Sequence, residues 1–167
     1  MLDNLKSKYI LQEIFENIKN KRKLNIIKYN KRVMIKLDIN KEDFETYITL
    51  KEFNVKYNTN IQDIDIKTLN LRGRNIRNEG LKDLNKIKFK GLNELNLDEN
   101  EISDINILEK VKFKELKGLN LSYNNISDIK VLENVKFEKL EKLDLSFNKI
   151  KDKSIISKLK IKNIIEL

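Results

Sequence analysis

A repeat with a fixed period of about 24 residues runs through the second half of the chain and constrains its fold more than any other feature. The segment that begins at Leu92 recurs from Leu116 and again from Leu140, and all three copies read LxxLxLxxNxI. The second half of each unit also recurs at the same offset, as Phe113 and Phe137 show. Fixed periods of roughly 20 to 50 residues are typical of architectures in which each unit stacks on the next. The sequence therefore predicts a solenoid of stacked coils.

Each copy has the spacing of a short strand followed by a turn. Successive side chains of a strand point to opposite faces, so Leu95 and Leu97 are expected to face the core and Asn96 the solvent. After the turn, Ser103 and Asp104 are residues that start helices well, and apolar residues follow at three-residue spacing. Each unit is therefore predicted to be a strand, a turn and a short helical return.

These copies resemble leucine-rich repeats, and their Asn-x-Ile-Ser-Asp-Ile string is similar to the SDS22-like class. The resemblance covers residues 66–167, with three clean copies, a drifted copy that has Arg74 in place of the motif asparagine, and a fifth copy that starts at Ile164. It implies an α/β fold, a leucine-rich repeat solenoid with parallel strands on the concave face and short helical or 3-10 returns on the convex face.

Two columns of residues are predicted to run along the solenoid. The resemblance implies that the amides of Asn100, Asn124 and Asn148 bond the backbone of neighbouring coils, whose polar groups would otherwise be buried and unpaired. The second column is assigned to the core and consists of Phe89, Phe113 and Phe137.

Residues 1–66 depart from the repeat pattern. Residues 1–45 contain two amphipathic helical patterns and are predicted to form an α-helical N-terminal cap, because the open end of a solenoid exposes apolar core. Residues 46–66 are predicted to be an extended strand or a decayed repeat, because Leu50, Phe53 and Val55 stand where the motif has leucines. Residues 67–167 hold the repeats, four of them and a terminal strand.

The N-terminal helices also have a second interpretation, which rests on the spacing of their apolar residues. The pattern resembles a degenerate F-box, the helical module that docks on the Skp adaptor of a cullin ubiquitin ligase. It departs from that family at Tyr9-Ile10 and in lacking a tryptophan after the second helix. The resemblance implies that residues 9–37 bind a Skp-like adaptor, through Leu11, Ile14, Phe15, Ile18, Leu24 and Ile27.

The composition argues against an enzyme. Histidine and cysteine are absent, which removes the commonest general base, the thiolate nucleophile and the usual zinc ligands. Asp98, Glu99 and Glu101 are the nearest candidates for acid–base chemistry, but other copies have serine and an aromatic residue at the first two positions. The four glycines never assemble into a phosphate-binding loop. We therefore predict a non-catalytic protein with no cofactor and no metal site.

The formal charge of +9 permits attraction to acidic proteins, nucleic acid or anionic membranes without choosing between them. The densest basic run, residues 19–36, has eight basic residues and no acid, but Tyr29 is its only ring, whereas single-stranded nucleic acid sites interleave several rings with the charge. The run leaves a basic adaptor in a ribonucleoprotein or other large assembly as a third interpretation. No segment has the pattern of a signal peptide or a membrane span, so we expect a cytoplasmic or nuclear protein.

The non-core positions of the predicted strands define the candidate partner-binding surface. A parallel strand array presents them together on one face, with Tyr123 and Phe147 at the rim, and aromatic anchors are typical of interface centres. Five strands span only about 20 Å, so a partner either engages the flanks as well or binds weakly as a peptide or helix. The predicted partner-binding residues are Arg72, Glu94, Asn96, Asp98, Asn120, Ser122, Tyr123, Lys142, Asp144, Ser146 and Phe147.

The last predicted strand lies at an open edge, which invites pairing with a partner or with another copy of the chain. Lys158, Lys160 and Lys162 would blunt that edge by their charge. The sequence as a whole predicts a non-catalytic protein–protein interaction module that binds a protein partner through the concave face. The main alternative is an F-box and leucine-rich repeat substrate receptor of a cullin-type ubiquitin ligase.

Overall fold

The computed structural model describes residues 35, 41–110, 113–135, 137–159 and 161–165. The chain divides into two compact units, Met1–Glu52 and Phe53–Leu167, and the second unit carries the repeats. The six residues of the F-box-like pattern and most of the predicted helical cap lie outside the described residues.

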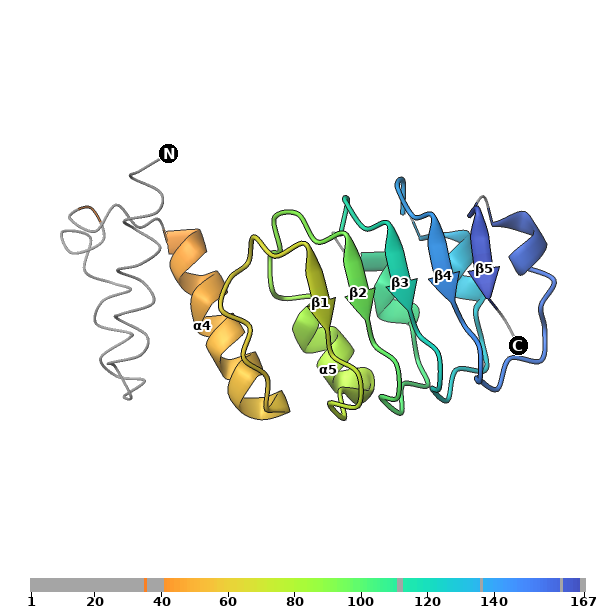
Figure 1. The fold of residues 1–167 in the computed structure, drawn as a ribbon, viewed down its shortest axis with the longest axis horizontal. Helices are drawn as coiled ribbons and strands as arrows, with labels where there is room; N and C mark the ends of the chain where they lie inside the picture. Colours follow the sequence, from red (N-terminus) through yellow and green to blue (C-terminus); the bar gives the residue numbers. More distant parts are fainter. Residues whose placement is uncertain (1–34, 36–40, 111–112, 136, 160, 166–167) are drawn as a thin grey trace. The chain divides into compact units, whose positions relative to one another are not determined.

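The second unit is built on one parallel sheet whose five strands follow one another in chain order (Figure 1). The middle residue of each strand pairs with the middle residue of the next, so that Leu69, Leu95, Leu119, Leu143 and Ile164 form one row. This sheet confirms the predicted parallel strand array. The strands are β1 (Thr68–Asn70), β2 (Glu94–Asn96), β3 (Gly118–Asn120), β4 (Lys142–Asp144) and β5 (Asn163–Ile165).

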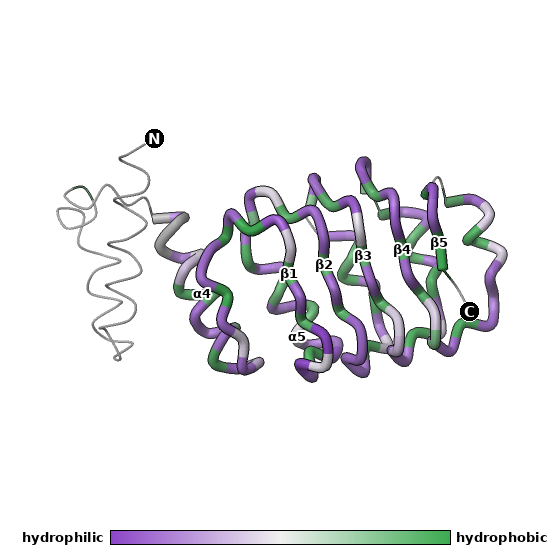
Figure 2. The backbone as a smooth tube through the Cα atoms, in the orientation of Figure 1, coloured by the Kyte–Doolittle hydropathy of each residue, from purple (hydrophilic) through white to green (hydrophobic). Residues whose placement is uncertain are grey.

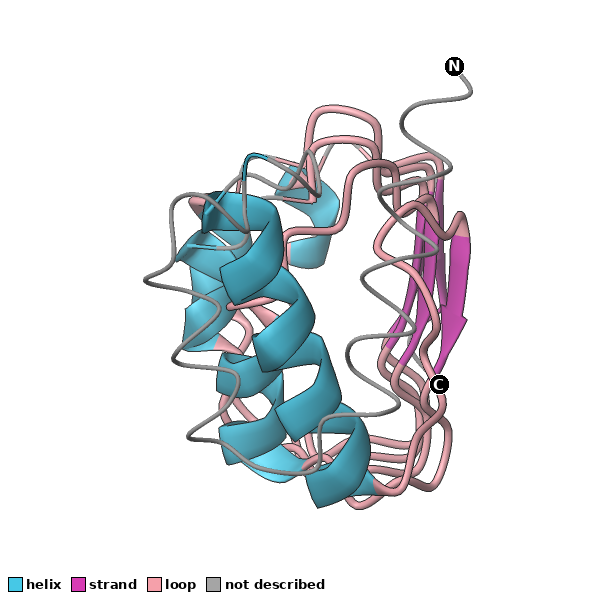
Figure 3. Ribbon diagram, turned by 90° about the vertical axis from the view of Figure 1, so that its left-hand side faces the viewer, coloured by secondary structure: helices cyan, strands magenta, loops and turns pink. Residues whose placement is uncertain are grey.

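The returns lie on the opposite side of the unit from the strands, which gives two layers (Figure 3). The first return is an α-helix of eight residues, and the others are 3-10 turns of three to five residues. The prediction of short helical or 3-10 returns is therefore confirmed. The returns are α5 (Arg77–Leu84), η1 (Asn106–Lys110), η2 (Lys130–Glu133) and η3 (Ile156–Lys158).

The core lies between these layers and is filled by the apolar positions of the motif. Hydropathy alternates along each coil, so that apolar segments recur at the same height from one coil to the next (Figure 2). Leu97 and Leu121, for example, are fully buried, and so are Ile102 and Ile126 on the far side of the turn. The phenylalanine column is present in part: the rings of Phe89 and Phe113 lie 6.1 Å apart.

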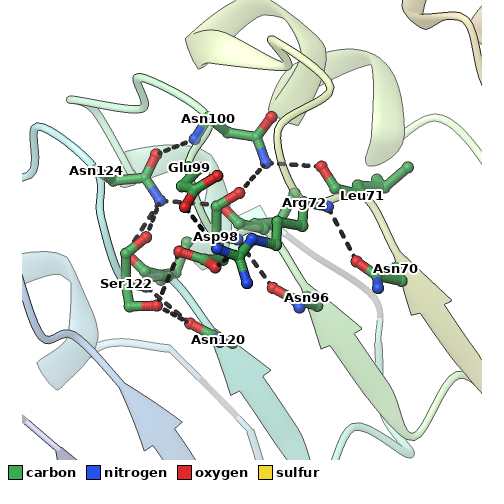
Figure 4. Close-up of polar contacts among 12 residues, drawn as sticks. Asn70, Leu71, Arg72, Asn96, Asp98, Glu99, Asn100, Asn120, Ser122 and Asn124 are labelled. Atoms are coloured by element: carbon green, nitrogen blue, oxygen red, sulfur yellow. Dashed lines mark hydrogen bonds and ion pairs between the residues drawn. The ribbon is translucent and has the colours of Figure 1, made fainter.

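The predicted asparagine ladder is confirmed. The amide nitrogen of Asn124 donates to the carbonyl of Leu97 in the preceding coil at 2.9 Å and to those of Leu121 and Ser122 in its own coil. Its Oδ1 accepts from the backbone N–H of Asn100 (Figure 4) and from that of Ile102. Asn100 and Asn148 repeat this arrangement. Buried turn backbone is thus paired by one side chain in each coil.

The prediction of an extended strand or decayed repeat over 46–66 is wrong for its first part, because residues 46–57 belong to α4 (Lys41–Tyr57). Leu50, Phe53 and Tyr57 are buried, and their spacing of three and four residues is that of one helix face. Val55 lies off that face and is 79% exposed. The apparent strand motif was a helical pattern, since only Val55 distinguished the two periods.

The coils differ in length at the two ends of the solenoid. The two middle coils, from Leu95 to Leu119 and from Leu119 to Leu143, are equal in length. The first coil, from Leu69 to Leu95, is two residues longer than these, and the last coil, from Leu143 to Ile164, is three residues shorter. Insertions and deletions relative to the repeat therefore fall on the terminal coils.

Candidate functional site

The exposed face of the sheet, which we call the strand face, contains a shallow hollow of about 770 Å³. Strands β1 to β5 all contribute to its lining. Five of the predicted partner-binding residues line it directly, namely Glu94, Asn96, Asn120, Lys142 and Asp144. The structure therefore brings these residues together on one surface.

A second polar ladder lies on this face and engages several of the same residues. The side-chain oxygens of Asn70, Asn96, Asn120 and Asp144 each accept a hydrogen bond from the backbone N–H two residues further on, at 2.8 to 3.0 Å. These Asx turns end the strands. One lone pair of each oxygen is therefore engaged within its own coil, which fixes the orientation of these side chains on the strand face. The recurrence of Asn or Asp at this position was a signal for such turns in the sequence.

Three other predicted partner-binding residues are buried beneath the rim. Asp98, Ser122 and Ser146 are only 4 to 5% exposed. The Ser122 hydroxyl donates to Asp98 at 3.1 Å and lies 2.7 Å from Asn120 Oδ1. These side chains therefore support the rim from within, because a partner on the strand face would reach little of their surface.

Arg72 is held in place at one end of the rim. Its Nε lies 3.1 Å from Asp98 Oδ2, and one terminal nitrogen donates to Glu99 Oε1 at 2.6 Å (Figure 4). The hydrogen bond from Arg72 lowers the pKa of Glu99, and the same bond raises the pKa of Arg72. Arg72 is therefore a neutralised, oriented guanidinium rather than a free charge.

Tyr123 and Phe147 form a stacked aromatic pair on the rim. Their ring centroids lie 4.1 Å apart with an interplanar angle of 16°. Both side chains are largely open to solvent, at 50% and 55% exposure. Together with Ile35, Val55 and Ile165 they are the exposed large hydrophobic residues of the described part of the chain.

The backbone of this pair is also unusual. Tyr123 and Phe147 have φ of 49° and 53°, in the left-handed region, and Gly73 and Glu99 have φ of 63° and 57° at the same position of earlier coils. Backbone hydrogen bonds hold this turn, for example from Tyr123 N–H to the Ser146 carbonyl at 3.1 Å. Left-handed backbone costs an L-residue roughly 1–2 kcal/mol. Bulky aromatic residues are thus placed where glycine would be the least strained choice.

Neither a metal site nor a membrane span is found in the described residues. They hold no group of three or more acidic, histidine or cysteine side chains that could bind a metal ion. None of the helices in that part of the chain combines the length and the apolar character that crossing a membrane requires.

Comparison with known families agrees with the geometry. Residues 114–160, which run from before β3 to beyond η3, match the family described as leucine-rich repeats (2 copies). Together with the parallel sheet, this match supports the fold of an α/β leucine-rich repeat solenoid. Such repeats generally mediate protein–protein interaction and are typically non-catalytic. No curated protein matches the chain significantly. The SDS22-like subtype and the F-box-like pattern stay predictions from the sequence.

Proposed function

We propose that this protein is a non-catalytic interaction module whose strand face binds a segment of a protein partner. The observation that carries the proposal is the aromatic pair of Tyr123 and Phe147, which is half-exposed on the rim of an otherwise polar face. Aromatic residues are enriched at the energetic centres of protein interfaces. The pair is therefore the expected anchor for the partner.

Two physical arguments support this role for the pair. Solvent-exposed rings give up the free energy of burying their apolar surface, about 25 cal/mol per Å², and a partner that covers them recovers it. Their left-handed backbone adds a local strain that glycine would avoid. Neither property stabilises the isolated coil, so both are explained better by binding than by folding.

The size of the face sets the kind of complex. A standard protein interface buries about 800 Å² on each partner, which exceeds what five strands of three residues offer. A partner that contacts only the strand face would thus be a peptide or a single helix, held weakly. Tighter binding would need contacts on the flanks of the solenoid.

Affinity capture with quantitative mass spectrometry tests the proposal in the cell of origin. Tyr123→Gly/Phe147→Gly removes both rings while keeping a residue that tolerates the left-handed backbone. Val55→Ala is the matched control, because it removes an even more exposed apolar side chain on α4. We expect recovery of a single direct partner to fall at least ten-fold with the double variant only. Equal recovery by all three proteins would reject the strand face as the site.

The apolar spacing over residues 9–37 supports a separate proposal, docking on a Skp-like adaptor. In the full chain, Leu11→Asp/Ile14→Asp would abolish capture of such an adaptor and its cullin. The partner that depends on Tyr123 and Phe147 would then be the selected substrate and would still bind. Capture experiments that never contain an adaptor would leave the helices without this role.

A further inference from the structure

The last coil lacks part of what fills the core of the middle coils. From Leu143 to Ile164 it is three residues shorter than the coil from Leu119 to Leu143. Counted back from the middle of the strand, Lys158 stands where the two preceding coils have Phe113 and Phe137. The coil has therefore lost both chain length and an aromatic ring on its return side.

The loss shows in the burial of the preceding coil. Leu108, Phe113 and Leu116 are 1%, 6% and 0% exposed beneath a full-length coil. Their counterparts beneath the short coil are more open: Leu132 and Leu140 are each 6% exposed, and Phe137 is only half-buried. Leu132 and Leu140 thus have less cover than Leu108 and Leu116, whereas the phenylalanine position varies along the solenoid, since Phe89 is half-buried as well.

A cavity of about 460 Å³ lies where the cover is missing, and we call it the end pocket. Its volume falls within the range of roughly 300–1,000 Å³ that is usual for ligand pockets. The apolar side chains that line it come from η2, β4 and the loops beside η2 and η3, and include Leu132, Val135, Phe137, Leu140, Leu159 and Ile161.

The repeat itself indicates which side chain the end pocket fits. At this repeat position the ring centroids of Phe89 and Phe113, in successive coils, lie 6.1 Å apart. The coil after Phe137 has Lys158 at this repeat position instead of a ring. A ring supplied from outside would continue the column and cover the half-buried Phe137. The repeat therefore favours a phenylalanine side chain as the occupant.

The charge of the chain around the end pocket indicates which residues would flank that phenylalanine. Glu133 and Lys158 line the pocket and form an ion pair of 2.9 Å, so they neutralise each other. The sequence from 130 to 162 contains ten lysines and five acidic residues, a net charge of +5 within a chain of +9. A segment with acidic residues on both sides of the phenylalanine would complement this charge.

We propose that the end pocket binds a phenylalanine side chain presented by an acidic segment of a protein partner. The end pocket shares Leu143 with the hollow of the strand face but contains neither Tyr123 nor Phe147, so variants of the aromatic pair separate the two sites. The interaction is expected to be weak for a short peptide, because a single apolar side chain supplies most of it.

The test is a titration of the full chain with the peptide acetyl-Glu-Glu-Phe-Glu-Glu-amide, followed by the NMR shifts of methyl groups at low salt. We expect saturable shifts at Leu132, Leu140 and Ile161. Replacing the peptide phenylalanine by alanine should weaken binding at least ten-fold, and replacing its glutamates by lysines should weaken it several-fold. Absence of saturable shifts at these methyl groups, or equal binding of the alanine peptide, would overturn the proposal. If the lysine peptide bound as tightly as the glutamate peptide, the proposal that acidic residues flank the phenylalanine would be wrong.

Variants of the chain provide the matched controls. Ile161→Phe places a ring on a residue that lines the pocket, so it should raise the thermal midpoint and weaken peptide binding at least ten-fold. Should this variant fail to fold, Leu159→Phe fills the same pocket. Tyr123→Gly/Phe147→Gly should bind the peptide as the unaltered chain does, which separates this site from the strand face. A filled pocket that still binds the peptide with unchanged affinity contradicts the inference.

Discussion

The two ends of the solenoid close in different ways. At the N-terminal end the first coil is two residues longer than the middle coils and has the eight-residue helix α5 as its return. At the C-terminal end the last coil is three residues shorter than the middle coils and has only the three-residue η3. Ile165 in the last strand is 50% exposed. The first coil thus has the longer return, whereas the last described coil has the shorter one.

The closed end depends on a close approach between residues 53–57 of α4 and helix α5. A Cβ at Gly80 would lie 3.0 Å from the Tyr57 ring and 2.7 Å from Ile76, so only glycine lets the ring pack this closely. The Tyr57 hydroxyl donates to Asp83 at 2.9 Å, and the Phe53 ring lies 4.6 Å from the Tyr57 ring. The Phe53 and Tyr57 rings therefore cover the first coil.

The comparison shows that the returns vary in length from coil to coil while the strands do not. All coils share the strand and the first part of the turn, so the strand face is continuous across both ends. Leu81 and Leu84 of α5 are 1% and 0% exposed in the longer first coil, whereas Leu132 and Leu140 beneath the short last coil are each 6% exposed. The strand face and the returns can thus change independently.

Removing one ring at each end should give the largest difference. Phe53→Ala is expected to destabilise the protein by about 3–5 kcal/mol, because the side chain is 2% exposed. Phe137→Ala should cost about half as much, because it is already partly open to the end pocket. Urea unfolding measures both. Equal losses would mean that the two ends are equally well packed.

The asparagine ladder of the turns, to which Asn124 and Asn148 belong, offers the next test. Asn124→Ala removes the two hydrogen bonds that its Oδ1 accepts and those that its two N–H groups make with three carbonyls, and should cost about 3 kcal/mol, because the backbone groups around it are buried. Asn148→Ala, in the more open coil, should cost about 1–2 kcal/mol because water can replace part of its bonds. Chemical denaturation of the two variants gives the order, and a larger loss at Asn148 would contradict it.

Adding one methyl group to a glycine should distinguish a sealed contact from an open one. Gly80→Ala should destabilise by about 1–3 kcal/mol despite the higher helix propensity of alanine, because the methyl group meets the Tyr57 ring. Gly118→Ala should change stability by less than about 1 kcal/mol, because the colliding Glu94 carboxylate is exposed and can move. Thermal unfolding compares the two variants. If Gly80→Ala were more stable than the parent, the Tyr57 ring would not be closely packed against α5.

Acid should weaken the closed end through Asp83. Burial by itself raises the pKa of Asp83, but hydrogen bonds from Lys56, Lys86 and Tyr57 outweigh it and lower the pKa from 3.8 to about 2. Because the folded pKa is depressed, the stabilisation is present above about pH 4 and is lost as the pH falls toward 2. Asp83→Asn should remove roughly 1–2 kcal/mol of this dependence. Identical pH profiles of stability for the variant and the parent would argue against it.

The smallest stability effect is expected on the strand face. Tyr123→Gly/Phe147→Gly should change the free energy of unfolding by less than about 1 kcal/mol, since relief of the left-handed backbone offsets the lost ring stacking. Circular dichroism with urea measures this. A loss above about 3 kcal/mol would mean that the rings serve the fold rather than a partner.

Much of the solenoid could be predicted from the sequence because its rules are local and repeated. The two-residue spacing of Leu95 and Leu97 places them in the core, and the asparagine that follows lies where the turn needs a partner. Because three copies align in register, each such assignment is supported by three independent positions. The same approach failed at residues 46–57, where no second copy was present to separate a helical from a strand period.

The candidate site was predicted less completely, because exposure depends on neighbours from other coils. Asp98 and Ser146 were assigned to the binding surface by their alternation along the strand, yet the turn curls them under the rim. The stacking of Tyr123 on Phe147 likewise needs two coils in contact.

By itself the sequence determined the repeat, the strand positions, the ladder and the absence of histidine and cysteine chemistry. Only the tertiary structure decided which polar side chains are buried, how residues 53–57 seal the first coil and that the short last coil leaves a cavity. The physical reason is the range of the interactions. Periodicity and turn chemistry act within one coil, whereas burial, ring stacking and cavity volume arise only between segments that the fold brings together.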